Sequence, residues 1–342
     1  KWDGIRAQLI CRGGRVVLWS RGEERLDGRF PELEAAARAL PDGTVLDGEI
    51  LAYEPSARKD DEAAAEADHK KRDDNTSGDP AAEKQSTGRH RLSYTFAALQ
   101  RRIGRKKPSA AMLAAVPVDF MAYDLLEAHG VDWRARPLRE RRTRLEAVLA
   151  DQPPPLRLSE SVTADSWPQL AALREESRSR GVEGLMLKAR ESAYGTGRQR
   201  GSWWKWKIDP LTVDAVLLYA QPGSGRRSNL LTDYTFGVWS DGELVTVCKA
   251  YSGLDNDEIG ELDRWIRAHT TERFGPVRAV EPELVFEIAF EGVWPSKRHK
   301  AGVAFRFPRI LRWRRDLKLA DADSLETVRS TMAFTGARQA NP

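Results

Sequence analysis

Lys1-Trp2-Asp3-Gly4-Ile5-Arg6 opens the chain and runs directly into an apolar segment. Residues 5–11 and 15–20 read as two strands, and Gly13-Gly14 between them is typical of a hairpin turn. The lysine therefore precedes a hairpin, next to an Asp-Gly turn and a nearby cation. A lysine amine attacks only when neutral, and burial or neighbouring positive charge favours that form. The hexapeptide predicts a lysine nucleophile, with a charged surface turn as the alternative.

Composition indicates a globular protein of about two domains. The chain has 342 residues, 41% of them hydrophobic, and no apolar run approaches the ~20 residues of a membrane span. Cys11, Cys248 and five scattered histidines show no metal-ligand spacing. We therefore interpret all five histidines as solvated or structural. The low cysteine content is typical of a reducing cytoplasm.

The net charge of +4 is modest, but basic residues cluster in three segments, at 101–107, 134–144 and 306–318. Clustered cations are typical of proteins that bind a polyanion. In residues 306–318, aromatic and aliphatic side chains alternate with the cations, which favours such binding. In residues 139–142 a glutamate is interleaved with arginines, and we expect a solvated helix face there.

Strands and helices are mixed without strict alternation, so we expect an α+β fold. Further strands are expected at residues 45–53, 116–126, 182–188 and 203–208. Helices are expected at residues 31–40, 137–149 and 166–180, the last with Asp165 as its N-cap. Residues 55–90 contain almost no large apolar side chain. Such a composition cannot offset chain entropy, so we expect a disordered insertion.

Asp209-Pro210 predicts a domain boundary. Beyond it, we expect one helix at residues 255–269 and strands at 213–219, 234–240, 244–250, 284–290 and near 305. Five or so strands with one helix suit a small Greek-key barrel of the OB type, a common nucleic-acid platform. The expected organisation is a first domain at residues 1–210, a barrel at 211–330 and a tail at 331–342.

Further motifs follow the hexapeptide in a fixed order. They are Ser20-Arg21, Asp47-Gly48-Glu49, FMAYD at 120–124, EGLMLK at 183–188, WKWK at 204–207, RFPR at 306–309 and Arg314-Arg315-Asp316. The ordered set resembles the ATP-dependent DNA ligases of the covalent nucleotidyltransferase superfamily, and RFPR is most similar to the bacterial enzymes. The resemblance covers nearly the whole chain outside the insertion. It implies a nucleotidyltransferase (adenylation) domain of antiparallel sheets with flanking helices, followed by an OB-fold domain.

The resemblance implies a site for ATP. Lys1 is the expected nucleophile, which attacks the α-phosphate to give lysyl-AMP before AMP passes to the 5′-phosphate of a nick. The expected nucleotide contacts are Arg6, Arg21, Glu49, Phe120, Glu183, Arg200, Lys205 and Lys207. Among these, Phe120 is expected to stack on the purine. Glu49 and Glu183 are also the expected ligands of Mg²⁺, which usually takes one or two protein carboxylates together with phosphate oxygens.

The C-terminal basic segment is expected to orient the pyrophosphate leaving group and to bind DNA. Its expected contacts are Arg306, Arg309, Arg314 and Asp316. The family usually has Arg-x-Asp-Lys at this point, whereas here Leu317 follows the aspartate and Lys318 comes one place later. Many relatives carry a helical DNA-encircling domain upstream of the lysine. We therefore expect this chain to be a piece of a longer protein.

Two alternatives remain open. An mRNA-capping guanylyltransferase or an RNA ligase shares the lysine motif, and an inactive nucleic-acid-binding module would use only the barrel and its basic segment. The ordered motifs favour a DNA ligase that acts on nicked double-stranded DNA with ATP and Mg²⁺. We expect a cytoplasmic monomer that makes no membrane contact.

Overall fold

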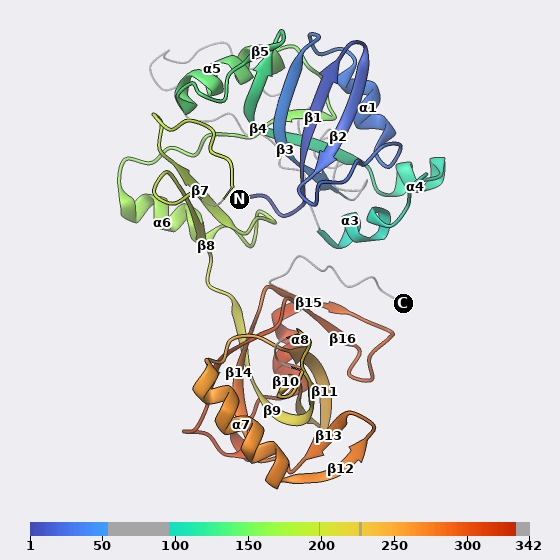
Figure 1. Cartoon of the computed structure of the whole chain (residues 1–342), viewed down its shortest axis with the longest axis vertical. Helices are drawn as coiled ribbons and strands as arrows, with labels where there is room; N and C mark the ends of the chain where they lie inside the picture. Colours follow the sequence, from blue (N-terminus) through green and yellow to red (C-terminus); the bar gives the residue numbers. More distant parts are fainter. Residues whose placement is uncertain (54–95, 198, 226–227, 333–342) are drawn as a thin grey trace, which may run out of the picture. The chain divides into compact units, whose positions relative to one another are not determined.

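A computed structural model describes residues 1–53, 96–197, 199–225 and 228–332. The insertion expected at 55–90 lies outside these residues, as does the expected tail beyond residue 332. The backbone divides into two compact units, Lys1–Ile208 and Asp209–Pro342. Each unit has a hydrophobic core of its own. The chain passes from one to the other between strands β8 and β9 (Figure 1).

The first unit is built on a six-stranded sheet of order β2-β1-β3-β4-β5, in which β6 pairs with β4. Its strands are β1 (Ile5–Arg12), β2 (Arg15–Ser20), β3 (Thr44–Ala52), β4 (Val118–Ala128), β5 (Val131–Asp132) and β6 (Leu156–Leu158). The expected hairpin is confirmed, because β1 and β2 pair antiparallel and Gly13 and Gly14 take positive φ angles of 57° and 70°. Glycine adopts these angles without strain.

The first unit also contains helices. They are α1 (Pro31–Ala37), α3 (Phe96–Ile103), α4 (Ala110–Ala115), α5 (Leu138–Leu149) and α6 (Trp167–Glu175). Figure 1 shows α1 and α5 against the sheet, and they contribute Leu33 and Leu145 to its core. The helix expected at 166–180 is shorter than predicted and begins one residue later. Its N-cap is Ser166, not Asp165, because the Ser166 hydroxyl accepts the Gln169 N–H at 3.3 Å.

The solvated face expected at residues 139–142 is wrong at Arg141, which is fully buried in α5. Its Nε and Nη2 donate to the two carboxylate oxygens of Asp124 on β4, at 2.8 and 3.0 Å. A buried guanidinium is tolerated when its donors are satisfied by an opposite charge. The mixed charges of this segment therefore include an internal ion pair.

A two-stranded ribbon, β7 (Gly184–Lys188) with β8 (Trp203–Lys207), stands apart from the six-stranded sheet. Gly184 has φ of 130°, and a Cβ there would lie 2.3 Å from the Trp206 carbonyl oxygen, so only glycine fits. The start of the chain pairs with the residues before β7. Trp2 forms an antiparallel bridge with Val182, and the Glu183 N–H donates to the Lys1 carbonyl at 2.8 Å.

The second unit is a curled antiparallel sheet of order β11-β10-β9-β13-β12, extended by β14 and β17, with a separate β15–β16 ribbon. Its strands are β9 (Leu211–Pro222), β10 (Leu231–Ser240), β11 (Glu243–Ala250), β12 (Thr270–Phe274), β13 (Val277–Val280), β14 (Val285–Phe290), β15 (Gly292–Pro295), β16 (Val303–Arg306) and β17 (Arg309–Trp313). Strands β12, β13, β15 and β17 are not predicted by the sequence, because they are short and lack strong alternation.

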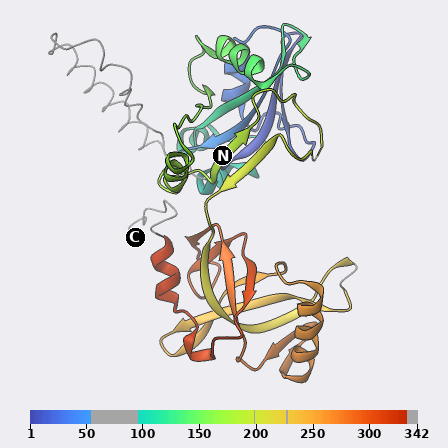
Figure 2. The same cartoon turned by 90° about the vertical axis from the view of Figure 1, so that its left-hand side faces the viewer.

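Two helices flank the curled sheet on different sides, as Figure 2 shows in orange and red: α7 (Asn256–Ala268) and α8 (Leu325–Ser330). Helix α7 begins one residue after the predicted start, because Asp255 is its N-cap and forms a reciprocal capping box with Glu258. Both units mix helices with mainly antiparallel strands, which confirms the expected α+β class. Within the described ranges, no helix has the length and apolar character needed to cross a membrane.

Candidate active site

Lys1 is held at the edge of the β7–β8 ribbon. Its Nζ donates a hydrogen bond to Glu183 Oε2, and Lys207 Nζ lies 3.1 Å from the same oxygen. The side chains of Lys1 and Glu183 are 19% and 16% exposed, so the amine is restrained yet reachable. Burial alone would raise the pKa of Glu183, but the two ammonium groups hold it below its ordinary value.

Cations gather around Lys1. Lys205 and Lys207 alternate along β8 and therefore share one face of the ribbon. The pKa of Lys205 is lowered by burial and by the positive charges of Lys1, Arg21 and Lys207. The Arg21 N–H also donates to the Arg6 carbonyl at 3.2 Å, which fixes this residue beside β1. The structure thus brings together four of the expected residues as a site for anions.

Asp47 is a buried centre of hydrogen bonding on β3 that the sequence analysis quoted without a role. It accepts from Arg6 Nε at 3.2 Å and from Nη2 at 2.7 Å. The hydroxyls of Tyr123 and Tyr194 donate to it at 3.3 and 2.8 Å. Asp47 lies two residues before Glu49, on the same face of the strand. This two-residue spacing is the feature of the sequence that indicates a position for Asp47 in the site.

Glu49 differs electrostatically from Glu183, although both act on Lys1. Burial raises the pKa of Glu49 to about 7, with Lys1 opposing the shift. The two carboxylates come from separate segments, Glu49 from β3 and Glu183 from the residue before β7, one position outside the strand expected at 182–188. Carboxylate oxygens are the protein ligands that Mg²⁺ prefers, so this donor pair fits such an ion.

Phe120 does not line the site, so its expected stacking role is wrong. The residue is fully buried in the core, and its ring fills the space beside Gly48, where a Cβ would lie 2.6 Å from it. Tyr123 instead contacts the site through Asp47, and Lys188 Nζ lies 4.7 Å from the centre of its ring. Phe120 and Tyr123 are three positions apart in the motif FMAYD. An odd spacing along a strand places two side chains on opposite faces, so the motif itself indicates that the two rings face different ways.

Lys188 is a further site residue that the sequence analysis left without a role. Its Nζ lies over the rings of Tyr123 and Trp203, at 4.7 and 4.1 Å from their centres. Burial lowers the pKa of this lysine, and the aromatic faces partly compensate for lost water. Arg200, by contrast, is exposed in the loop before β8. No other position in that loop was predicted to contact the nucleotide.

The four residues expected in the C-terminal basic segment all lie in the second unit. Arg314 Nη1 contacts both oxygens of Asp214, at 3.0 and 2.8 Å, and its Nη2 contacts Asp316 at 2.8 Å. Arg306 lies over the rings of Trp294 and Phe307. The remaining residue, Arg309, is half-buried at the start of β17. Asp316 therefore orients an arginine in this structure.

Comparison with known families decides the assignment. A family model described as "ATP dependent DNA ligase domain" matches residues 1–207, and a second, "ATP dependent DNA ligase C terminal region", matches 227–317. The chain belongs to the ATP-dependent DNA ligase family. The first match contains the whole Lys1 cluster, and the second contains the basic segment of the curled sheet. Family membership thus agrees with the resemblance inferred from the ordered motifs.

Among curated relatives, a probable DNA ligase of Koribacter versatilis is 37% identical over 348 residues, covering 95% of this chain and 54% of that protein. A probable DNA ligase of Opitutus terrae is 38% identical over 367 residues, covering 98% and 33%. The ligase of Natronomonas pharaonis is 32% identical, covering 96% and 53%. The chain thus spans about half the length, or less, of the curated relatives it matches.

Solved structures share the fold, and two of them are similar over most of this chain. One, titled Pmar-Lig_PreS3, has a TM-score of 0.62 at 17% identity and covers 92% of this chain and 62% of its own. Another, from a structure–function study of Lig E DNA ligases, has a TM-score of 0.54 at 21% identity and covers 92% and 90%. Together with the C-terminal family match, they confirm the expected α+β architecture with an OB-type second unit.

Proposed function

We propose that this chain is the catalytic core of an ATP-dependent DNA ligase that seals nicks in double-stranded DNA. Lys1 Nζ attacks the α-phosphorus of ATP, a P–N bond forms and pyrophosphate leaves. The AMP then passes to the 5′-phosphate of the nick, and the 3′-hydroxyl displaces it as the phosphodiester forms. The observation that carries this proposal is the position of Lys1 Nζ against Glu183, among the cations Arg21, Lys205 and Lys207.

Each neighbour of Lys1 has a distinct role in the first step. Glu183 is hydrogen-bonded to the amine and is placed to hold the proton that Nζ must lose before it attacks. Lys205, Lys207 and Arg21 neutralise the charge that accumulates on the phosphate oxygens. When bound through Glu49 and Glu183, Mg²⁺ supplies further neutralisation of the phosphates.

In this proposal, the adenine base and the ribose lie against Asp47 and the three side chains that donate hydrogen bonds to it, Arg6, Tyr123 and Tyr194. Tyr123 offers an aromatic face for the adenine in place of the buried Phe120, and stacking of this kind contributes about 1–3 kcal/mol. Asp47 and Tyr194 fix the guanidinium of Arg6, which then presents its remaining donor surface to the ribose or the phosphates. Arg200 is retained as a nucleotide contact from the loop before β8.

The second unit supplies contacts to pyrophosphate and DNA through its basic segment. Arg306 and Arg309 are the proposed contacts there, and Arg314 is bound by Asp214 and Asp316. Arg314 must therefore release one of these two carboxylates before its guanidinium can contact a phosphate. We further propose that the protein acts as a monomer in the cytoplasm, where its nucleic-acid substrate lies.

Covalent labelling tests the first step. Purified protein incubated with Mg²⁺ and ATP radiolabelled at the α-phosphate should retain protein-bound label that is stable in alkali and released by acid, as expected for a P–N bond, and Lys1→Arg should abolish it while preserving the circular dichroism spectrum. Label that persists in Lys1→Arg, or its absence from the wild-type protein, would contradict the proposal. Competition by unlabelled GTP would favour a capping enzyme, and exclusive sealing of RNA nicks would favour an RNA ligase.

A matched pair of variants tests the aromatic assignment. Tyr123→Ala should raise the KM for ATP in adenylation about tenfold, because one stacking face is lost. Phe120→Ala should instead lower the free energy of unfolding by about 3–5 kcal/mol, because it empties a core position. A Tyr123→Phe variant keeps the ring and should keep the KM. The assignment fails if Phe120→Ala raises the KM for ATP and Tyr123→Ala leaves it unchanged.

A further inference from the structure

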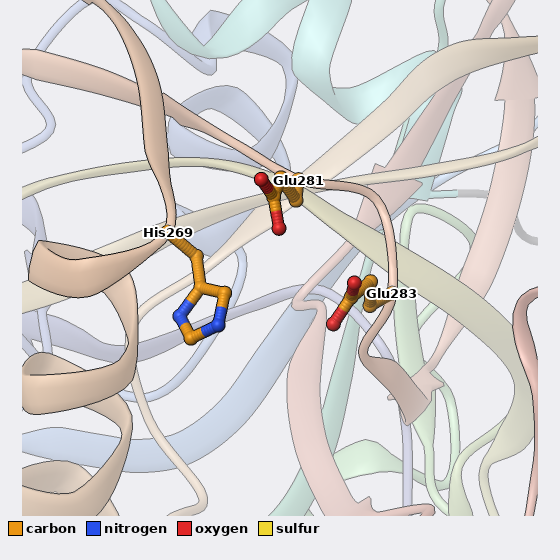
Figure 3. A group of neighbouring side chains, drawn as sticks. All are labelled: His269, Glu281 and Glu283. Carbon is orange, nitrogen blue, oxygen red and sulfur yellow. The ribbon is translucent and has the colours of Figure 1, made fainter.

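Three potential metal ligands converge in the second unit, at the carboxyl end of α7. His269 ends this helix, and Glu281 and Glu283 lie in the connection between β13 and β14. One imidazole nitrogen and one oxygen from each carboxylate all lie within 4.8 Å of one another. Figure 3 shows the three side chains turned toward a common space. By sequence alone, His269 is expected to be solvated or structural.

The imidazole of His269 is oriented for coordination. Its Nδ1 lies 2.9 Å from the Trp265 carbonyl oxygen, which can only accept, so Nδ1 carries the proton. In the neutral imidazole this tautomer leaves the lone pair on Nε2, where an ion can bind it. The ring also stacks on the Trp265 indole, with centres 4.3 Å apart and planes 7° from parallel. A histidine that donates Nδ1–H to a carbonyl is the usual outer arrangement of a metal ligand.

The two carboxylates are held near His269 by the backbone. The Glu281 N–H donates to the His269 carbonyl at 3.1 Å, and the Glu283 N–H donates to the Glu281 carbonyl at 3.0 Å. Within the part of the chain that the structure describes, neither carboxylate forms an ion pair with a basic side chain. Two unneutralised carboxylates at the negative end of a helix dipole repel each other and attract a cation.

We propose that His269, Glu281 and Glu283 bind one Zn²⁺ ion, with water as a fourth ligand. Zinc accepts imidazole nitrogen and carboxylate oxygen at about 2.0–2.2 Å, which places tetrahedral ligands about 3.4 Å apart. Glu281 and Glu283 are exposed, so small rotations bring their oxygens to that spacing. Mg²⁺ and Ca²⁺ prefer all-oxygen ligands, which separates this site from the carboxylate pair near Lys1.

The proposed ion has a structural role and takes no part in the ligation reaction. It joins the end of α7 to the β13–β14 connection, where the Glu281–His269 backbone hydrogen bond continues the pairing of Thr270 with Val280 in the β12–β13 ladder. Because Zn²⁺ binds the folded unit and not the unfolded chain, its binding stabilises that unit by mass action. The site is independent of the ligation chemistry, so its test needs no turnover.

Calorimetric titration of the metal-free protein with Zn²⁺, in a buffer with excess Mg²⁺ to occupy oxygen-only sites, tests the proposal. We expect one zinc ion per chain, and binding at least tenfold weaker in His269→Ala and in the double variant Glu281→Gln/Glu283→Gln. The matched controls are His299→Ala and Glu272→Gln, exposed residues of the same unit outside the cluster. Both should bind zinc as the wild-type protein does.

Two further measurements distinguish this site from other zinc ligands in the chain. Zn²⁺ should raise the melting temperature of the wild-type protein and of both controls, but not of His269→Ala. Co²⁺ in place of Zn²⁺ should give the visible absorption of a four-coordinate ion, lost in the same variant. Zinc binding that is absent, that persists unchanged in His269→Ala, or that is lost only with Glu49→Gln would overturn the proposal.

Discussion

Glu49 and Glu183 show how one site holds two carboxylates in different states. Hydrogen bonds from Lys1 and Lys207 keep the pKa of Glu183 low, whereas burial raises the pKa of Glu49 to about 7. A pair of titratable groups with opposite shifts is typical of catalytic sites. In the absence of a divalent cation, the negative charge of Glu49 lowers the free energy of unfolding, and this loss of stability can be measured.

Glu49→Gln should stabilise the protein at alkaline pH while removing a ligand needed for adenylation. The folded pKa of Glu49, about 7, lies above its ordinary value of 4.5. The folded state therefore holds more protons between these values, and stability falls as pH rises through this window. Without Mg²⁺ and ATP, urea denaturation should show Glu49→Gln more stable than wild type by about 1–3 kcal/mol at pH 8.

The same comparison at pH 4 should show no gain, because Glu49 is then protonated in both the folded and the unfolded protein. The exposed Glu24→Gln serves as the control and should match the wild-type protein at both pH values. Equal stability of Glu49→Gln and wild type at pH 8 would show that Glu49 carries no unfavourable charge.

Helix α5 links the core to the site through Arg141. Besides its pair with Asp124, this residue donates from Nη1 to the Ser192 carbonyl at 3.0 Å. The Leu138 N–H, at the start of the helix, donates to the same carbonyl at 2.9 Å. Two residues further along, Tyr194 donates to Asp47. The helix thus positions the loop that delivers a tyrosine to the active site.

Arg141→Ala should lower the free energy of unfolding by about 3–5 kcal/mol, because it leaves the Asp124 carboxylate buried without its partner. The neighbouring Arg139→Ala removes an exposed pair with Glu191 and should leave stability essentially unchanged. Chemical denaturation of both variants makes the comparison. Equal losses in the two variants would mean that burial of the pair has no energetic consequence.

Among the described residues, the large hydrophobic cores of the two units share no residue. The first includes Leu9, Leu46 and Leu145, and the second includes Phe236 and Phe286. Both are extensive enough for an independently folding domain of ordinary size. The backbone divides at Asp209, one residue before the proline where the sequence analysis placed the boundary. Separate cores indicate separate unfolding equilibria.

Scanning calorimetry of the whole chain should therefore resolve two transitions. A truncated chain that ends at Ile208 should show one of them at an unchanged temperature, because its core is retained in full. Addition of ATP should shift that transition alone, since the proposed nucleotide contacts near Lys1 lie in the first unit. A single transition of the whole chain, lost on truncation, would show that the two units fold as one.

Much of the fold follows from local pattern. The Gly13-Gly14 turn between two apolar segments predicts the first hairpin, and the pattern of residues 255–269 predicts a helix that the structure has as α7. The short strands β12 and β13 were missed because five residues or fewer offer too little periodicity to distinguish strand from loop. The order of the motifs along the chain predicts the family, and it does so without any knowledge of which side chains touch.

Contacts between residues far apart in the chain required the tertiary structure. Lys1 meets Glu183, and His269 meets Glu281 and Glu283, only because strand pairing and the end of α7 bring them together. Burial separates Tyr123 from Phe120 and places Arg141 inside. The physical reason is that residue type and spacing encode backbone preferences locally, whereas partners, burial and pKa depend on the whole fold. Motif order alone therefore predicts the chemistry, and packing selects the residues that carry it out.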